Sequence, residues 1–171
     1  MPYVIGILAV ALILYFATNA SADCNVTGDE LNCNISSDPS TWPNGCSASG
    51  NGAVWDVCRA IAIAEGANVA GSNPDVCNNP GDISDGANTY GSQSHSGSQV
   101  TTFPSKQVGW QWLYNKIYNA FIMGSSSVYN ANMTWTQFAQ AYAGNWQAWV
   151  NNVTGQLGVS PDDRVGDYFG T

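Results

Sequence analysis

The sequence predicts an α+β fold that is mostly α-helical. Four segments between residues 53 and 158 combine helix-type apolar spacing with helix start or stop signals, and a short fifth segment follows them. Only QVTTF, residues 99–103, alternates like a β-strand, and the Gly-rich segment before it suits a hairpin turn. With 171 residues, 44% hydrophobic and 12% aromatic, the chain is long enough for one domain with a core.

The first predicted helix covers residues 53–65. Asn51 is a suitable N-cap residue for it, and Gly66 is the residue type that commonly follows a helix end. A turn-rich stretch rich in Asn, Asp and Gly runs from residue 67 to 97. Pro104 then suits the first position of a second helix, PSKQVGWQWLYNKIYNAFIMG, which carries apolar residues on two sides and is therefore expected to be largely buried.

Two further helices have clear boundary signals. Thr134 and Gln137 form a capping-box pattern that opens TWTQFAQAYA. Asn145 is expected to cap the next helix, which ends at Gly158. A last short helix is predicted to start at residues 160–163, SPDD, where the acidic side chains favour the helix N-terminus. The apolar stripe of the helix before it consists of Trp146, Trp149, Val150, Val153 and Leu157.

The N-terminal part of the chain has a different character. Residues 4–17 are an apolar run of 14, short for a membrane span but typical of a signal peptide, and Ala20-Ser21-Ala22 fits a cleavage site. No Lys or Arg precedes the run, so an uncleaved N-terminal membrane anchor at residues 1–22 is the alternative. Either reading predicts an extracytoplasmic location. Residues 23–52 are predicted to be an irregular, cysteine-containing segment ahead of a domain at 53–171.

The net charge and the cysteines indicate which ligands and cross-links the chain is suited to. The net charge of −8 argues against binding to nucleic acid, and the sequence has no basic stripe. Beyond a signal-like segment, five cysteines favour disulfides, with one left over. Because there is no C-x-x-C pair and His95 is the only histidine, we expect neither a metal site nor another cofactor. The cysteines are Cys24, Cys33, Cys46, Cys58 and Cys77.

Glu65 is the main candidate for chemistry. It continues the apolar row Val54, Cys58, Ile61 at helical spacing, so it is expected to face the core. It also ends the helix, where the helix dipole disfavours a negative charge. Both effects raise the pKa of a carboxyl, as a general acid near neutral pH requires. The alternative is an ordinary solvated glutamate at a helix end.

The order of the segments resembles the lysozyme-like superfamily, in particular small peptidoglycan-cleaving lysozymes and lytic transglycosylases. The matching pieces are the AIAEG helix end, the NNPGDI turn at 78–83, the strand VTTFPS and the GWQWL helix, so the resemblance covers about residues 53–170. It implies a helical domain with a small β-hairpin beside an active-site cleft, and Glu65 as the catalytic acid that cuts a β-1,4 bond between amino sugars of peptidoglycan.

The resemblance also assigns residues of the turn and of the strand beside the cleft, whereas the cysteine pair and the aromatic candidates follow from their own positions in the sequence. Asp82 is the preferred second carboxylate, with Asp75 and Asp85 as alternatives; if Asp82 only shapes the turn, Glu65 alone fits a transglycosylase. A disulfide between Cys58 and Cys77 would hold the turn to the helix. Candidate substrate-binding residues are Asn78, Asn79, Tyr90, Thr101, Phe103 and Tyr142. Trp110, Trp112 and Trp146 are weaker candidates, because aromatic residues at helical spacing usually belong to the core. His95 is also a weaker candidate, because a lone histidine in a loop usually has no functional role.

Two other functions stay open at this stage. One is a non-catalytic extracellular or virion structural protein on the same scaffold. The acidic charge favours it, because wall polymers are often anionic and would repel an acidic wall-cutting enzyme. The cysteine-containing segment at 23–50 is also a candidate pro-region that blocks the cleft until it is removed. The enzyme itself would be secreted, membrane-held or part of a virion.

Overall fold

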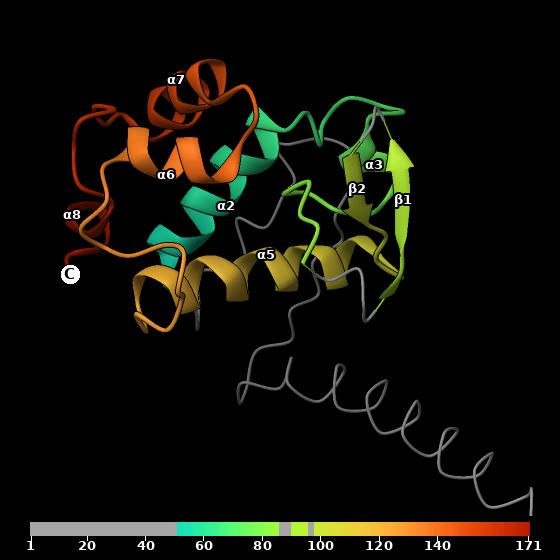
Figure 1. Ribbon diagram of the computed structural model, residues 1–171, viewed down its shortest axis with the longest axis horizontal. Coiled ribbons are helices and arrows are strands. Elements are labelled where there is room, and N and C mark those ends of the chain that lie inside the picture. The colour runs from blue at the N-terminus through green and yellow to red at the C-terminus, as the bar shows by residue number, and fades with distance from the viewer. Residues whose placement is uncertain (1–50, 86–89, 96–97) are drawn as a thin grey trace, which may run out of the picture. The chain divides into compact units, whose positions relative to one another are not determined.

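Figure 1 shows the computed structural model, which describes residues 51–85, 90–95 and 98–171. These residues all belong to one compact unit, Cys33–Thr171. The predicted signal peptide or anchor at 1–22 and nearly all of the segment 23–52 lie outside the described residues. Within the described part of the chain, no helix is both long and apolar enough to cross a membrane.

The architecture is mostly helical with one small sheet, so the predicted α+β class is confirmed. Six helices and a two-stranded antiparallel hairpin are described, with Ser92 paired to Thr101 and His95 to Ser98. In the order of the chain, and with the labels of Figure 1, they are α2 Gly52–Ala64, α3 Asn73–Val76, β1 Ser92–His95, β2 Ser98–Thr101, α5 Lys106–Phe121, α6 Trp135–Tyr142, α7 Trp146–Leu157 and α8 Val165–Phe169.

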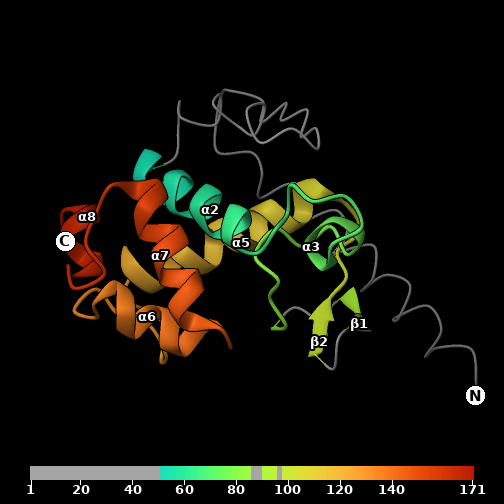
Figure 2. The same cartoon turned by 90° about the horizontal axis from the view of Figure 1, so that it is seen from above.

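Helix α2 is the centre of the packing. It lies between α5 on one side and α7 on the other, and α6 packs against α7 (Figure 1). The hairpin and α3 lie at one end of α2 and α5, and α8 lies at the opposite end, as the view from above also shows (Figure 2). The C-terminal end of α2 therefore points toward the hairpin side of the domain.

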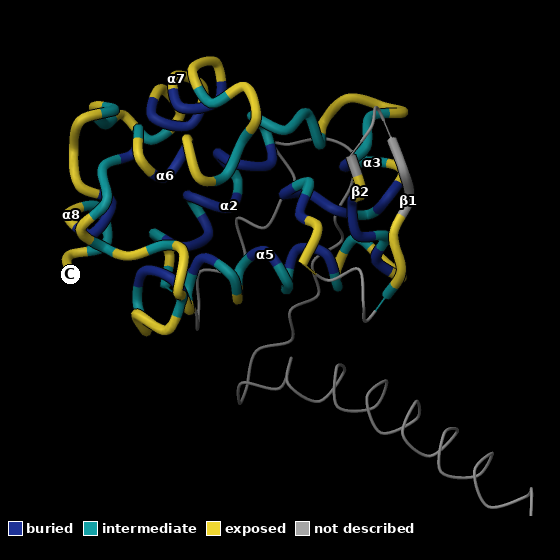
Figure 3. Tube along the Cα trace, viewed as in Figure 1, coloured by how far each residue is buried: buried dark blue, intermediate teal, exposed yellow. Residues whose placement is uncertain are grey.

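The core forms where these helices face one another. Figure 3 shows buried residues on the inner sides of α2, α5 and α7 and exposed residues in the outer loops. Burial of such side chains is the main source of stability in a domain of this size. The largest fully buried side chains are Trp135, Phe103, Phe121, Phe138, Ile61, Leu113 and Ile117.

Most predicted helix ends are confirmed. The side chain of Asn51 accepts a hydrogen bond from the backbone N–H of Ala53 and caps α2, while Gly66 follows its end with φ +79°. The capping box of Thr134 and Gln137 is present at α6. Helix α7 ends at Gly158 in the left-handed conformation.

Two predicted helix starts were wrong. Helix α5 begins at Lys106 rather than at Pro104, because the hydroxyl of Ser105 accepts from the N–H of Val108 and so caps the helix one residue after the proline. Only one face of α5 is buried. Helix α8 begins at Val165, so the acidic residues at 162–163 precede it in a turn.

Close packing joins the N-terminal turn of α5 to the segment after α3. A Cβ atom built on Gly109 would lie 1.9 Å from the backbone oxygen of Asn78 and 3.0 Å from the Cδ of Pro80. Only glycine allows this approach. The turn that follows α3 is therefore held against α5 by backbone contact.

Candidate active site

Glu65 lies at the C-terminal end of α2, as the sequence predicted. It is the C-cap residue, and its backbone N–H donates to the carbonyl of Ile61. Gly66 then turns the chain away with a positive φ, so the carboxyl stays at the end of the apolar row. The residue is half-buried.

Trp149 of α7 is the hydrogen-bond partner of this carboxyl. Its indole Nε1–H donates to Oε1 of Glu65 at 2.7 Å, and only 4% of the Trp149 surface is exposed. The two residues are brought together because α7 packs along α2. The sequence placed Trp149 in the core stripe of α7 and gave it no role at the site.

The surroundings raise the pKa of Glu65 from its ordinary value of 4.5 to about 7. Burial is the largest cause, since it disfavours the charged form; the negative charge of Asp82 acts in the same direction. The hydrogen bond from Trp149 opposes them by favouring the charged form. A carboxyl with this pKa carries its proton for about half of the time near neutral pH.

Asp82 is thus close enough for its charge to act on Glu65. It lies in the turn after α3 and adopts φ +47°, a left-handed conformation that aspartate tolerates better than most residues. The structure therefore brings together the two carboxyl groups that the sequence analysis paired. They come from segments that lie 17 positions apart in the chain.

The other two candidates for the second carboxylate are engaged elsewhere. Asp75 forms an ion pair with Lys106 at 2.8 Å, which is the main reason why its pKa is lowered. Asp85 pairs with Lys116 at 2.6 Å and also accepts a hydrogen bond from the indole of Trp112 at 3.2 Å. Of the three, only Asp82 is among the groups that shift the pKa of Glu65.

Asn79 organises the turn that carries Asp82. Its side chain is fully buried and makes three hydrogen bonds to backbone: it donates to the carbonyls of Ile83 (2.7 Å) and Thr101 (2.9 Å) and accepts from the N–H of Ile83 (3.0 Å). These bonds close the turn and join it to strand β2. The amide is thereby committed to the scaffold and is not presented to a ligand.

Asn78 plays a similar part. Its side-chain amide donates to the carbonyl of Phe103 at 3.0 Å, and its φ of +52° lies in the left-handed region. Together the two asparagines fix the turn to the end of β2 and to the residues just after it. The sequence analysis had proposed both as substrate-binding residues, because their side chains are polar and lie beside a turn.

Tyr142 connects the turn to α6. Its hydroxyl donates to the carbonyl of Gly81 at 2.7 Å, and its ring lies 5.0 Å from the ring of Trp149. A Cβ atom on Gly81 would lie 2.8 Å from that hydroxyl, so glycine is needed for the contact. One contiguous cluster thus contains Glu65, Trp149, Tyr142 and the turn at 81–82.

The remaining predicted binding residues are placed differently. Thr101 and Phe103 are buried, whereas Tyr90 is half-buried and packs its ring against Phe103 (5.4 Å) and Trp112 (5.6 Å). His95 lies in β1, and its side chain is outside the described part of the structure. Trp110 is buried, and Trp146 is half-buried.

The cysteines give no disulfide in the part of the chain that is described. Cys58 in α2 and Cys77 after α3 are both buried and are not bonded to each other. Burial raises the pKa of the Cys58 thiol well above its ordinary value, which keeps it protonated. The other three predicted disulfide candidates, Cys24, Cys33 and Cys46, lie outside the described residues.

The described residues contain no candidate metal site, and comparison with known proteins gives no match. Within the residues that the structure describes, no three His, Cys, Asp or Glu side chains gather in a way that could hold a metal ion. No protein-family model matches the chain, and neither a curated protein nor a solved structure is significantly similar to it.

Proposed function

We propose that residues 53–171 form a lysozyme-like domain that cleaves the β-1,4 bond between amino sugars of peptidoglycan, with Glu65 as the general acid. The observation that carries this proposal is a half-buried carboxyl at the C-terminal end of α2 that accepts a 2.7 Å hydrogen bond from the buried indole of Trp149. Burial raises the pKa of this carboxyl to about 7. Glycoside cleavage requires such a group to protonate the leaving oxygen.

The arrangement around Glu65 supports the same reaction. A helix ends in the acid, a turn carries a second carboxylate, a hairpin follows, and the next long helix packs under the turn. This is the order of segments on which the resemblance to lysozymes and lytic transglycosylases rests.

Asp82 is the best candidate for the second carboxylate. Its charge acts on Glu65, whereas Asp75 and Asp85 are held by lysines. As a carboxylate it stabilises positive charge on the sugar or activates a water molecule after the glycosidic bond breaks. If it only shapes the turn, Glu65 acts first as acid and then as base, which leads to an anhydro sugar.

Peptidoglycan lies outside the cytoplasm, so the proposal includes export. A signal peptide or membrane anchor at residues 1–22 would deliver the domain to the wall, either as a secreted protein or held at the membrane. A virion-associated wall-cutting protein has the same requirement. The reaction as proposed uses carboxyl groups and water.

Product analysis tests the proposal. The full chain is incubated with purified peptidoglycan, and the masses of the soluble fragments are measured by mass spectrometry. We expect muropeptides with reducing or anhydro ends from the native protein and none from Glu65→Gln. The matched control is Glu30→Gln, which changes the only other glutamate in the chain and should keep full activity. Equal product from Glu65→Gln and the native protein contradicts the proposal.

The alternative is a non-catalytic extracellular or virion structural or binding protein on the same scaffold. The observation in its favour is the net charge of −8, which opposes approach to anionic wall polymers. It predicts that native protein and Glu65→Gln both release no fragments from peptidoglycan.

A further inference from the structure

We propose that Trp149 is a positioning residue that fixes the acidic proton of Glu65 on Oε2 and stabilises the carboxylate formed when that proton leaves. This inference rests on the proposed role of Glu65 as the acid. It adds a residue from α7, 84 positions away in the chain, to the machinery of the site.

The argument begins with the chemistry of the indole. The Nε1–H of tryptophan is a donor and cannot accept a hydrogen bond. At 2.7 Å from Oε1 it occupies that oxygen with a proton of its own. A carboxylic acid proton on the same side of Oε1 would collide with the N–H, so the acid holds its proton on Oε2.

Packing keeps the indole in place. The Trp149 ring meets Phe138 edge-on, with ring centroids 5.4 Å apart and planes at 89°, and lies 5.0 Å from Tyr142. Such contacts between buried aromatic rings favour one orientation. Because Trp149 is only 4% exposed, its side chain belongs to the core and offers almost no surface to a substrate.

The hydrogen bond changes strength during the proposed reaction. When Oε2 gives its proton to the glycosidic oxygen, the C–O bond of the leaving sugar breaks and Glu65 becomes a carboxylate. The bond from Trp149 to Oε1 is then charge-assisted and stronger. Oε2 later takes a proton from the attacking water or sugar hydroxyl, which restores the acid. Trp149 exchanges no proton at any stage.

The other charged or titratable groups around Glu65 have different effects. Asp82, from the turn, raises the pKa of Glu65. Tyr142, from α6, gives its hydroxyl to Gly81, and burial together with the charge of Glu65 raises its pKa well above the ordinary value, so it stays neutral. Trp149 supplies the hydrogen bond that favours the charged form of Glu65.

A spectroscopic titration tests the contact without any substrate. The full chain is labelled with ¹⁵N, and the indole N–H resonance of Trp149 is followed from pH 5 to pH 9. We expect the resonance to move with a midpoint at the pKa of Glu65, about 7, and this movement to vanish in Glu65→Gln. A resonance that does not titrate, or that titrates equally in Glu65→Gln, overturns the inference.

The kinetic test is Trp149→Phe, which keeps an aromatic ring but removes the N–H. We expect kcat on peptidoglycan to fall about ten- to hundredfold, with KM unchanged, because a hydrogen bond to the transition-state charge is lost. The alkaline limb of the pH profile should move to higher pH, since the bond that favours the carboxylate is gone.

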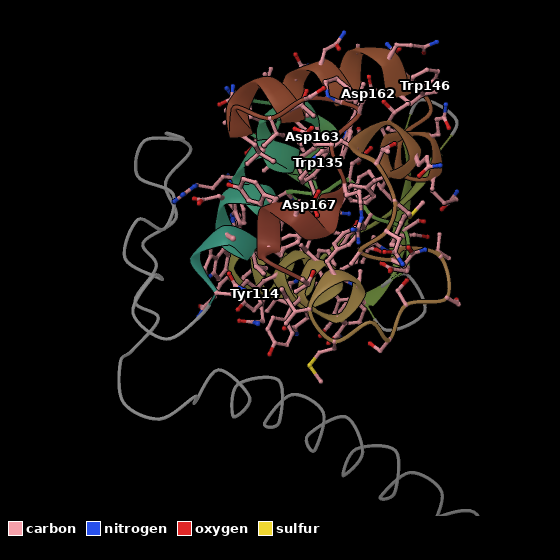
Figure 4. All side chains as sticks on the ribbon, turned by 90° about the vertical axis from the view of Figure 1, so that its left-hand side faces the viewer. Tyr114, Trp135, Trp146, Asp162, Asp163 and Asp167 are labelled. Atoms are coloured by element: carbon pink, nitrogen blue, oxygen red, sulfur yellow. The ribbon has the colours of Figure 1, made fainter. Side chains whose placement is uncertain are left out.

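Trp135→Phe is the matched control. Trp135 is also fully buried, but its Nε1 has no hydrogen-bond partner among the described residues. It packs on Tyr168 of α8, and Figure 4 shows it beside Asp163 at that end of the domain. This variant loses the same atoms and should keep the native pH profile, even if it unfolds at a lower temperature.

The two tests separate the possible failures. If native protein is inactive on peptidoglycan but the Trp149 resonance follows Glu65, the proposed function fails and the positioning contact stands. If native protein is active and Trp149→Phe keeps both its kcat and its pH profile, the proposed function stands and the inference fails.

Discussion

Replacing Glu65 with glutamine removes a carboxyl that the folded protein prefers to keep protonated. Its pKa in the folded state, about 7, is above the ordinary value of 4.5 that it regains on unfolding. The folded protein therefore binds this proton more tightly than the unfolded chain does. Below about pH 4.5 the carboxyl is protonated in both states and does not lower the free energy of unfolding. As the pH rises from 4.5 toward 7, the unfolded chain ionises this group more readily, and the free energy of unfolding falls.

The magnitude follows from the difference between the two values. A rise of about 2.5 in pKa, at about 1.36 kcal/mol for each unit, corresponds to roughly 3 kcal/mol of stability lost above pH 7. Glutamine never ionises, and its side-chain carbonyl still accepts the hydrogen bond from Trp149. We expect Glu65→Gln to be more stable than native protein by up to about 3 kcal/mol at pH 8 and about equal to it at pH 4.

Urea unfolding followed by tryptophan fluorescence measures this difference. The free energies of unfolding are compared at pH 4 and pH 8, with the slope against urea expected to stay constant between the proteins. Asp162→Asn is the control, because it removes one negative charge at an exposed site and should show no such pH-dependent gap. A Glu65→Gln protein that is less stable than native at pH 8, or equally stabilised at both pH values, refutes the reasoning.

Two further changes test the surroundings of the acid. Asp82→Asn keeps a residue type that tolerates the positive φ and removes the nearby charge, so the pKa of Glu65 should fall. ¹³C NMR of the labelled carboxyl measures this pKa, and an unchanged value contradicts the effect assigned to the charge of Asp82. Gly109→Ala places a methyl group against the backbone oxygen of Asn78 and should cost about 3 kcal/mol or more in urea unfolding. Gly155→Ala, in α7 with open space around it, should instead be neutral or stabilising by up to about 1 kcal/mol, and a similar loss from both would disprove the close packing.

The location of Glu65 could be predicted from the sequence because its determinants are local. Asn51 and Gly66 mark the two ends of one helix, and the apolar spacing between them places the carboxyl on the core-facing row. The upward shift of the Glu65 pKa could also be predicted, because the sequence places the carboxyl on a buried row and at a helix end. Pro104 misled the start of α5 because the neighbouring Ser105 is the better N-cap.

The partners of Glu65 could not be predicted in the same way. Trp149 reaches the carboxyl only because α7 packs on α2, and the stripe of α7 marks it simply as a core residue. One signal was available: a buried indole N–H needs an acceptor, and few acceptors lie near an apolar core. Asn79 was predicted to bind substrate because it is a polar residue in a turn. Its side chain instead points inward, where it donates to the carbonyl of a strand residue 22 positions away.

The pH dependence of kcat/KM on purified peptidoglycan tests the central claim most directly, because it reports the pKa of the essential acid in the free protein. We predict that activity falls about tenfold per pH unit above an alkaline limb at about pH 7, and that Glu65→Gln has no measurable activity at any pH. Activity that persists unchanged well above pH 7, or that survives in Glu65→Gln, would contradict Glu65 as the acid.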